Sequence, residues 1–139
     1  MAKWLLAALL VLQAHFAASY LVPLDREAER EFGGLLQWAW PWSIGDGGLF
    51  GRIPASGEYP IAGVWLAGAA ALMFILAALA VMGWWVPFGW WRVLAMGGAI
   101  LSLLLMVGFF GATKVLPMTL DLVVLWVAIT DRLPAPPTG

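Results

Sequence analysis

The chain has 139 residues and a mass of 15.0 kDa, which is the size of one domain. Apolar residues make up 63% of it and charged residues 11%, against about a quarter in soluble proteins, and the mean hydropathy is +0.92. A soluble domain of this size cannot bury so much apolar surface. Seven basic and eight acidic residues provide no basic surface for nucleic acid. The absence of cysteine excludes disulfides, thiolate metal sites and cysteine nucleophiles. This composition predicts an integral membrane protein.

Long stretches without charge predict four membrane-spanning helices. The hydrocarbon core of a bilayer is about 30 Å thick and requires roughly 20 apolar residues per helix. The apolar runs are continuous rather than alternating, so helices are favoured over strands. We therefore expect an all-α integral membrane protein, a four-transmembrane-helix bundle that forms a single membrane domain over residues 1–139. The expected spans are residues 3–22, 60–85, 88–112 and 117–133.

The first span has a second interpretation. Lys3, the apolar run that follows it and the small residues 17–19 also fit a secretory signal peptide. Apolarity continues through Val22, which favours a retained helix. Basic residues are nearly balanced between the two sides, and Lys3 ahead of the first helix favours a cytoplasmic N-terminus. With four spans, the C-terminus is then cytoplasmic too.

A long loop, residues 23–59, holds most of the charged residues. Between Leu24 and Leu36 apolar residues recur at helical spacing and acid–base pairs occupy the other faces. This pattern predicts a short amphipathic helix on the membrane surface. The glycine-rich stretch 45–48 lacks the lysine of a phosphate loop and the ligands of an EF-hand, so we interpret it as a turn. Residues 134–139 form a short extended tail.

Tryptophan is abundant, with ten residues. Four of them lie at the adjoining ends of the second and third expected spans, and three alternate within the long loop. Tryptophan is enriched at membrane–water interfaces because its large apolar ring carries a polar N–H group. We expect an interfacial belt made by Trp38, Trp40, Trp42, Trp84, Trp85, Trp90 and Trp91.

Polar side chains within the spans gather in the half of the membrane next to the long loop. His15 is the only histidine, so one chain cannot supply a bis-histidine haem or a histidine cluster, and we assign no metal, cofactor or catalytic residue. Asp121 is the one carboxylate within a span and away from its ends, where an unpaired charge costs roughly 2.5–3.5 kcal/mol. We expect it to pair with Lys114 across a short turn, or with His15, and favour this over a proton or ligand contact. The candidate polar pocket contains Gln13, His15, Lys114 and Asp121.

Small residues recur at four-residue spacing on the second and third spans. Such spacing lets helices approach closely in lipid, either within the bundle or between copies of the chain. Ser102 belongs to one of these pairs and lies at mid-depth, apart from the polar pocket. The residues are Gly63, Ala67, Ala71, Ala95, Ala99, Gly98 and Ser102.

The hydropathy outline of nearly the whole chain is similar to that of several groups of small bacterial four-helix membrane proteins, including the DoxX-like group. No motif matches residue by residue. In size the chain also resembles the small multidrug transporters, whose first helix carries a membrane-embedded glutamate. Here that helix offers Gln13 and His15, so no functional residue is carried over. The resemblance implies a multi-pass protein of the bacterial inner membrane.

Three classes of function remain. We favour a non-catalytic accessory, scaffold or interaction subunit of a membrane assembly. Its partners are the lipid bilayer and other membrane subunits or further copies of the chain, and no nucleic acid. One alternative is a homo-oligomeric transporter or channel subunit, although a pore needs polar lining along its whole depth. The other is a subunit that binds a quinone or another cofactor in the His15–Asp121 region, although the sequence shows no catalytic set of nucleophile and base.

Overall fold

The computed structural model describes residues 2–23, 38–42, 47–48, 51–52 and 61–130. Four main helices make up nearly all of it: α1 (Ala2–Ala18), α4 (Ile61–Met82), α5 (Trp91–Gly108) and α6 (Val115–Thr130). Three short 3₁₀ turns adjoin them: η1 (Ser19–Leu21), η2 (Phe88–Trp90) and η3 (Ala112–Lys114). Two strands of two residues, β1 (Gly47–Gly48) and β2 (Gly51–Arg52), form an antiparallel pair. The all-helical class predicted from the sequence is confirmed.

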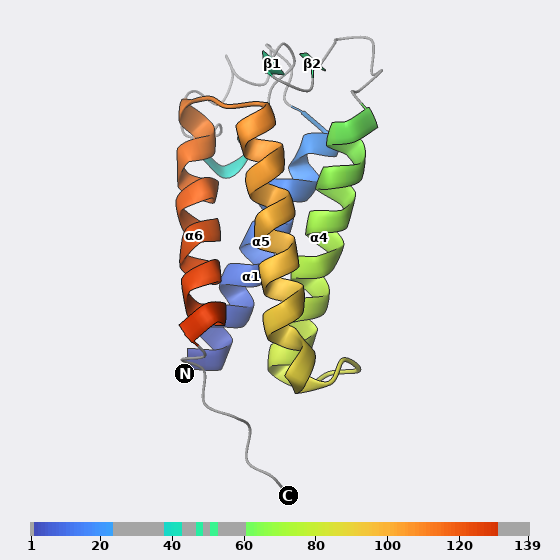
Figure 1. Cartoon of the computed structure of the whole chain (residues 1–139), viewed down its shortest axis with the longest axis vertical. Helices are drawn as coiled ribbons and strands as arrows, with labels where there is room; N and C mark the ends of the chain where they lie inside the picture. Colours follow the sequence, from blue (N-terminus) through green and yellow to red (C-terminus); the bar gives the residue numbers. More distant parts are fainter. Residues whose placement is uncertain (1, 24–37, 43–46, 49–50, 53–60, 131–139) are drawn as a thin grey trace, which may run out of the picture.

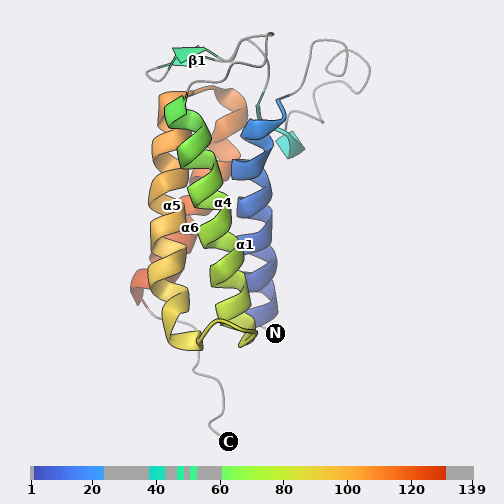
Figure 2. The ribbon, with the colours of Figure 1, turned by 90° about the vertical axis from the view of Figure 1, so that its right-hand side faces the viewer.

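The four helices form an antiparallel bundle (Figure 1). α1 packs against α4, α4 against α5 and α5 against α6, and α6 contacts α1 to close the ring. The start of α1, the turn between α4 and α5 and the end of α6 lie at one end of the bundle, and the two strands lie at the other (Figures 1 and 2). We call these ends the turn end and the loop end.

Among the residues that the structure describes, three helical segments are long and apolar enough to cross a membrane. They cover Ala2–Leu21, Ile61–Met82 and Phe88–Gly108. These segments correspond to the first three expected spans and fit a multi-pass membrane protein. α6 is also apolar but has 16 residues, which is about 24 Å at 1.5 Å per residue.

α4 ends earlier than expected because a glycine terminates it. Gly83 has φ +72°, a left-handed conformation that side-chain-bearing residues rarely adopt. Its N–H donates to the carbonyl oxygen of Ala80, and the N–H of Trp84 donates to that of Leu79. These two bonds satisfy carbonyl groups that the helix end leaves without partners. The helix therefore stops at Met82, short of the expected residue 85.

The ends of α5 and α6 also differ from the expected ones. α5 ends at Gly108 rather than at residue 112, and α6 begins at Val115 rather than at residue 117. Pro117 occupies the first turn of α6, where its missing N–H costs no helical hydrogen bond. The expected helix between Leu24 and Leu36, the first part of the 45–48 turn, residues 131–133 of the fourth span and the tail lie outside the described residues.

The interior divides into two apolar clusters. The larger one fills the middle and the turn end of the bundle and is rich in alanine, which lets the helices lie close together. The smaller one, at the loop end, is more aromatic. Its buried members are Phe16, Tyr20, Trp42, Ala67, Leu105, Met106 and Phe109.

Gly63 lets the buried ring of Tyr20 pack against α4. A β-carbon at Gly63 would lie 2.5 Å from Cζ of Tyr20. We expect Gly63→Ala to lower the free energy of unfolding by about 1–3 kcal/mol, because the ring has to move within a packed cluster. Gly68→Ala is the matched control, since a β-carbon there meets no atom within 4 Å. Unfolding in mixed detergent micelles, followed by tryptophan fluorescence, compares the two, and equal effects would contradict the close packing.

Arg92 links the start of α5 to the end of α6. Its Nε donates to the carbonyl oxygen of Ala128 at 2.7 Å, and its Nη2 donates to that of Ile129 at 3.4 Å. These carbonyls belong to the last turn of α6, where helical partners are missing and the helix dipole favours positive charge.

We expect Arg92→Gln to lower the free energy of unfolding by about 1–2 kcal/mol and to speed hydrogen exchange in the last turn of α6. Arg92→Lys, which keeps the charge, should cost less. Exchange that rises equally along all of α6 in the Gln variant would argue against a local role for Arg92.

Candidate functional site

Three polar side chains meet inside the bundle, one each from α1, α5 and α6. Gln13, Ser102 and Asp121 are all 0% exposed, and we call them the polar cluster. Nε2 of Gln13 donates to the carbonyl oxygen of Pro117 at 3.1 Å and to Oδ1 of Asp121. The hydroxyl of Ser102 lies beside the Asp121 carboxylate without completing a well-formed hydrogen bond. The amide of Gln13 thereby ties α1 to the first turns of α6.

The three residues lie at one depth. Gln13 comes five residues before the end of α1, Ser102 six before the end of α5, and Asp121 six after the start of α6. At 1.5 Å per residue these positions are about 8–9 Å below the loop end. The polar cluster therefore lies in the half of the bundle next to the long loop, where the sequence predicted polar residues.

Hydrogen bonding within the polar cluster is incomplete. Gln13 uses both amide hydrogens on Pro117 and Asp121. Oε1 of Gln13, Oγ of Ser102 and Oδ2 of Asp121 are buried and have no partner among the described residues. A buried polar atom without a partner costs about 1–3 kcal/mol. The cluster can therefore accept a donor or a positive charge at these three oxygens.

An aromatic group closes the bundle between the polar cluster and the loop end. The ring centroids of Tyr20, Trp42 and Phe109, which we call the aromatic cap, are 5.1 Å, 5.3 Å and 5.8 Å apart, with the Tyr20–Trp42 and Trp42–Phe109 pairs edge to face. Nε1 of Trp42 donates to the carbonyl oxygen of Phe16 at 2.7 Å. Nζ of Lys114, almost fully buried, lies 5.0 Å from the centroid of the Trp42 ring. The cap thus separates the polar cluster from the loop end.

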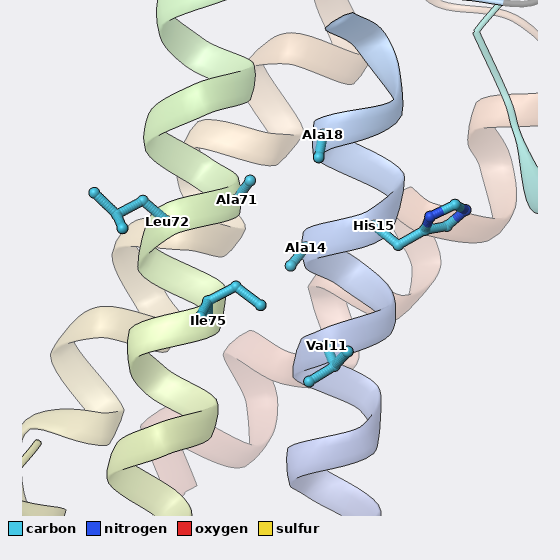
Figure 3. A pocket seen from close by; sticks show the side chains of 7 residues that line it. All are labelled: Val11, Ala14, His15, Ala18, Ala71, Leu72 and Ile75. Atoms are coloured by element: carbon cyan, nitrogen blue, oxygen red, sulfur yellow. The ribbon is translucent and has the colours of Figure 1, made fainter. Parts of the chain in front are cut away.

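The structure joins two of the four residues of the expected polar pocket and separates the other two. Asp121 contacts Gln13, whereas Lys114, the partner favoured from the sequence, lies at the aromatic cap. The ring of His15 packs against Trp40, and its Nε2 donates to the carbonyl oxygen of Ala39 at 2.6 Å. In Figure 3 the imidazole points away from α4. His15 and Asp121 therefore do not form one site.

The seven tryptophans of the expected belt fall into three groups by exposure. Trp38, Trp84, Trp85 and Trp90 are exposed, as an interfacial position requires. Trp40 is half-buried and donates from Nε1 to the carbonyl oxygen of Val22 at 2.6 Å. Trp42 and Trp91 are buried, so their rings face the protein interior rather than lipid headgroups. The segment 38–42 lies against the last turns of α1, where Ala39 bonds to His15 and Trp42 bonds to Phe16.

An apolar groove of about 420 Å³ runs along the outside of the bundle between α1 and α4 (Figure 3). The groove forms because alanine side chains on both helices fill little of the space between them. A second groove of about 420 Å³ continues toward the turn end and shares Val11 with the first. The first groove is lined by Val11, Ala14, His15, Ala18, Ala71, Leu72 and Ile75. We call it the α1–α4 groove.

No family model, no curated protein and no solved structure matches the chain. Within the part of the chain that the structure describes, no group of three or more histidine or acidic side chains is arranged to hold a metal ion. The described residues therefore offer two features for binding. One is the polar cluster, with its carboxyl, amide and hydroxyl groups, and the other is the apolar groove on the outer surface.

Proposed function

We propose that the chain is a four-span integral membrane protein, resident in a bacterial inner membrane, that serves as a non-catalytic accessory or scaffold subunit. It binds other membrane components through its outer surface. Large apolar side chains are exposed on all four helices, α6 included, as for Val11, Leu72, Ile100 and Leu122. Contact with lipid explains such a surface, since apolar patches of this extent are rare on soluble monomers.

Exposed tryptophans at both ends of the bundle support the proposal that α6 crosses the membrane. Trp65, 72% exposed, comes four residues after the start of α4 at the loop end. Trp126, 56% exposed, comes four residues before the end of α6 at the turn end, where Trp4 and Trp84 are also exposed. Tryptophan belts on two faces of a bilayer have this arrangement. α6 therefore crosses the membrane nearly upright, which suits its short length.

The α1–α4 groove supports an interaction role. In lipid, helices associate through close packing rather than through the hydrophobic effect, and small residues permit that packing. Ala14 and Ala18 of α1 and Ala71 of α4 are the small side chains that line the groove (Figure 3). Such a depression receives a helix from a partner subunit or from a second copy of the chain.

Filling the groove tests this function. Ala71→Phe occupies the groove, and Ala62→Phe is its matched control, an exposed alanine on the same helix outside the groove. Membranes are extracted with mild detergent, and co-eluting proteins are quantified by mass spectrometry. We expect a partner in fixed stoichiometry that survives Ala62→Phe and is lost with Ala71→Phe. Recovery of the chain alone, or a partner retained by both variants, contradicts the proposed role of the groove.

A second candidate, a subunit of a homo-oligomeric transporter, is favoured by the buried carboxyl group of Asp121. It predicts ion or proton flux in liposomes that contain only this chain. Flux that disappears with Asp121→Asn would assign transport instead of the accessory role.

A further inference from the structure

The polar cluster combines one carboxyl group with three unpartnered oxygen atoms. All of them are fully buried, and they come from three different helices. We propose that Gln13, Ser102 and Asp121 form an occluded binding site for one small monovalent cation, either a proton or Na⁺. Both cations carry one positive charge and interact favourably with buried oxygen atoms.

Charge balance is the first argument for a cation. Burying a carboxylate without a compensating charge is costly. Oδ1 of Asp121 receives only the neutral amide of Gln13, and Oδ2 has no partner among the described residues.

The ionisable groups on the surrounding elements are engaged elsewhere. Arg92 bonds to carbonyls at the end of α6, His15 bonds to Ala39, and Lys3 lies near the ring of Trp4. Lys114 lies over Trp42, and the hydroxyl of Tyr20 packs against Gly63. α4 contains no ionisable side chain. None of these groups supplies the charge that the Asp121 carboxylate requires.

A proton on Oδ2 of Asp121 completes the hydrogen bonding of the cluster. The new O–H donates to Oγ of Ser102, and the Ser102 hydroxyl donates to Oε1 of Gln13. The existing bond from Nε2 of Gln13 to Oδ1 closes the ring. All three unpartnered atoms are then satisfied, and the carboxyl group is neutral.

Na⁺ can use the same three oxygen atoms as ligands. Carboxylate, hydroxyl and amide oxygens are the ligands that hard cations prefer. A water molecule would satisfy hydrogen bonds but would leave the charge unbalanced. The aromatic cap on one side and the alanine-rich core on the other exclude solvent, so exchange of the cation requires local opening at the loop end.

Thermal unfolding of the full chain in detergent tests the site, with tryptophan fluorescence as the signal. NaCl is titrated against choline chloride at constant ionic strength, and pH is varied separately over about 5–8. A ligand that binds only the folded state raises Tm by about 3 °C or more for each tenfold rise in its concentration above Kd. We therefore expect Tm to rise with Na⁺ if Na⁺ is the ligand, or with falling pH if the proton is.

Single substitutions test whether the change of Tm with Na⁺ or pH arises at the polar cluster. Asp121→Asn is isosteric and neutral, and its amide supplies the hydrogen that the cation-free site lacks, so we expect it to fold and to respond to neither cation. Thr119→Ala, an exposed position on the same helix, should respond as wild type does. Ser102→Ala removes one oxygen and should weaken the apparent affinity about tenfold, the effect of one hydrogen bond to a charged group.

Two results would overturn the proposal. One is a wild-type Tm that changes with neither Na⁺ nor pH. The other is a response that persists unchanged in Asp121→Asn. If Asp121→Asn does not fold, Ser102→Ala decides the matter, because a midpoint identical to that of wild type contradicts the site.

Discussion

Gln13→Met is expected to lower the free energy of unfolding by about 2–4 kcal/mol. The substitution keeps the length of the side chain but removes both donated bonds, one to Pro117 and one to Asp121. The carboxyl group of Asp121 then stays buried with no donor from α1. Equilibrium unfolding in mixed micelles, followed by tryptophan fluorescence, measures the loss.

A double-mutant cycle separates this interaction from general loss of packing. Replacing both Gln13 and Asp121 by Met should cost about 1–3 kcal/mol less than the sum of the two single changes, because the carboxyl group that loses its donor in Gln13→Met is then absent as well. The corresponding cycle with Lys114→Gln should be close to additive, since Lys114 lies at the aromatic cap. Additivity between Gln13 and Asp121 would show that the amide does not hold the carboxyl group.

Trp42→Ala is expected to lower the free energy of unfolding by about 3–5 kcal/mol. The ring is fully buried in the aromatic cap, and its N–H bonds to Phe16. Loss of the ring also removes two edge-to-face contacts and leaves Lys114 without the ring beneath it.

Trp38→Ala is the control for this change. Trp38 belongs to the same segment but is 47% exposed, so its replacement should change the free energy of unfolding by about 0.5 kcal/mol or less. The same micelle titration compares the two variants. Similar losses for both would mean that the segment 38–42 is not anchored through Trp42.

Most of the fold follows from the sequence, because long uncharged apolar runs leave few alternatives to helices. Apolar runs that are long and uncharged predict α1, α4 and α5 within a few residues. The exact helix ends depend on residues with special backbone geometry, which a hydropathy profile does not detect. Examples are Gly83, which follows α4, and Pro117, in the first turn of α6. Trp42 departs most from expectation, since a residue in a polar loop folds back into the bundle.

The depth of the candidate site and two of its members, Gln13 and Asp121, were predictable from the sequence, but the third member, Ser102, was not. Gln13 and His15 are two residues apart and point to opposite sides of α1. The hydropathy pattern does not indicate which of the two faces inward, because α1 is apolar on all of its faces. Ser102 was placed apart from Asp121, yet both lie six residues from the same turn between α5 and α6. In an antiparallel pair of helices, positions equidistant from the turn share one depth, and this relation identifies Ser102.

The crossing of the membrane by α6 is the central claim, and cysteine accessibility tests it most directly. The chain has no cysteine, so single cysteines can be placed without background at Trp85, Phe110 and Thr130. These three positions are exposed and lie in the α4–α5 turn, in the α5–α6 turn and at the end of α6.

An impermeant maleimide added to intact cells should label the cysteine at Phe110, on the outer side, and spare those at Trp85 and Thr130. After the membrane is permeabilised, all three should react. Labelling of Thr130 together with Phe110 in intact cells would contradict the account, because α6 would then not cross the bilayer.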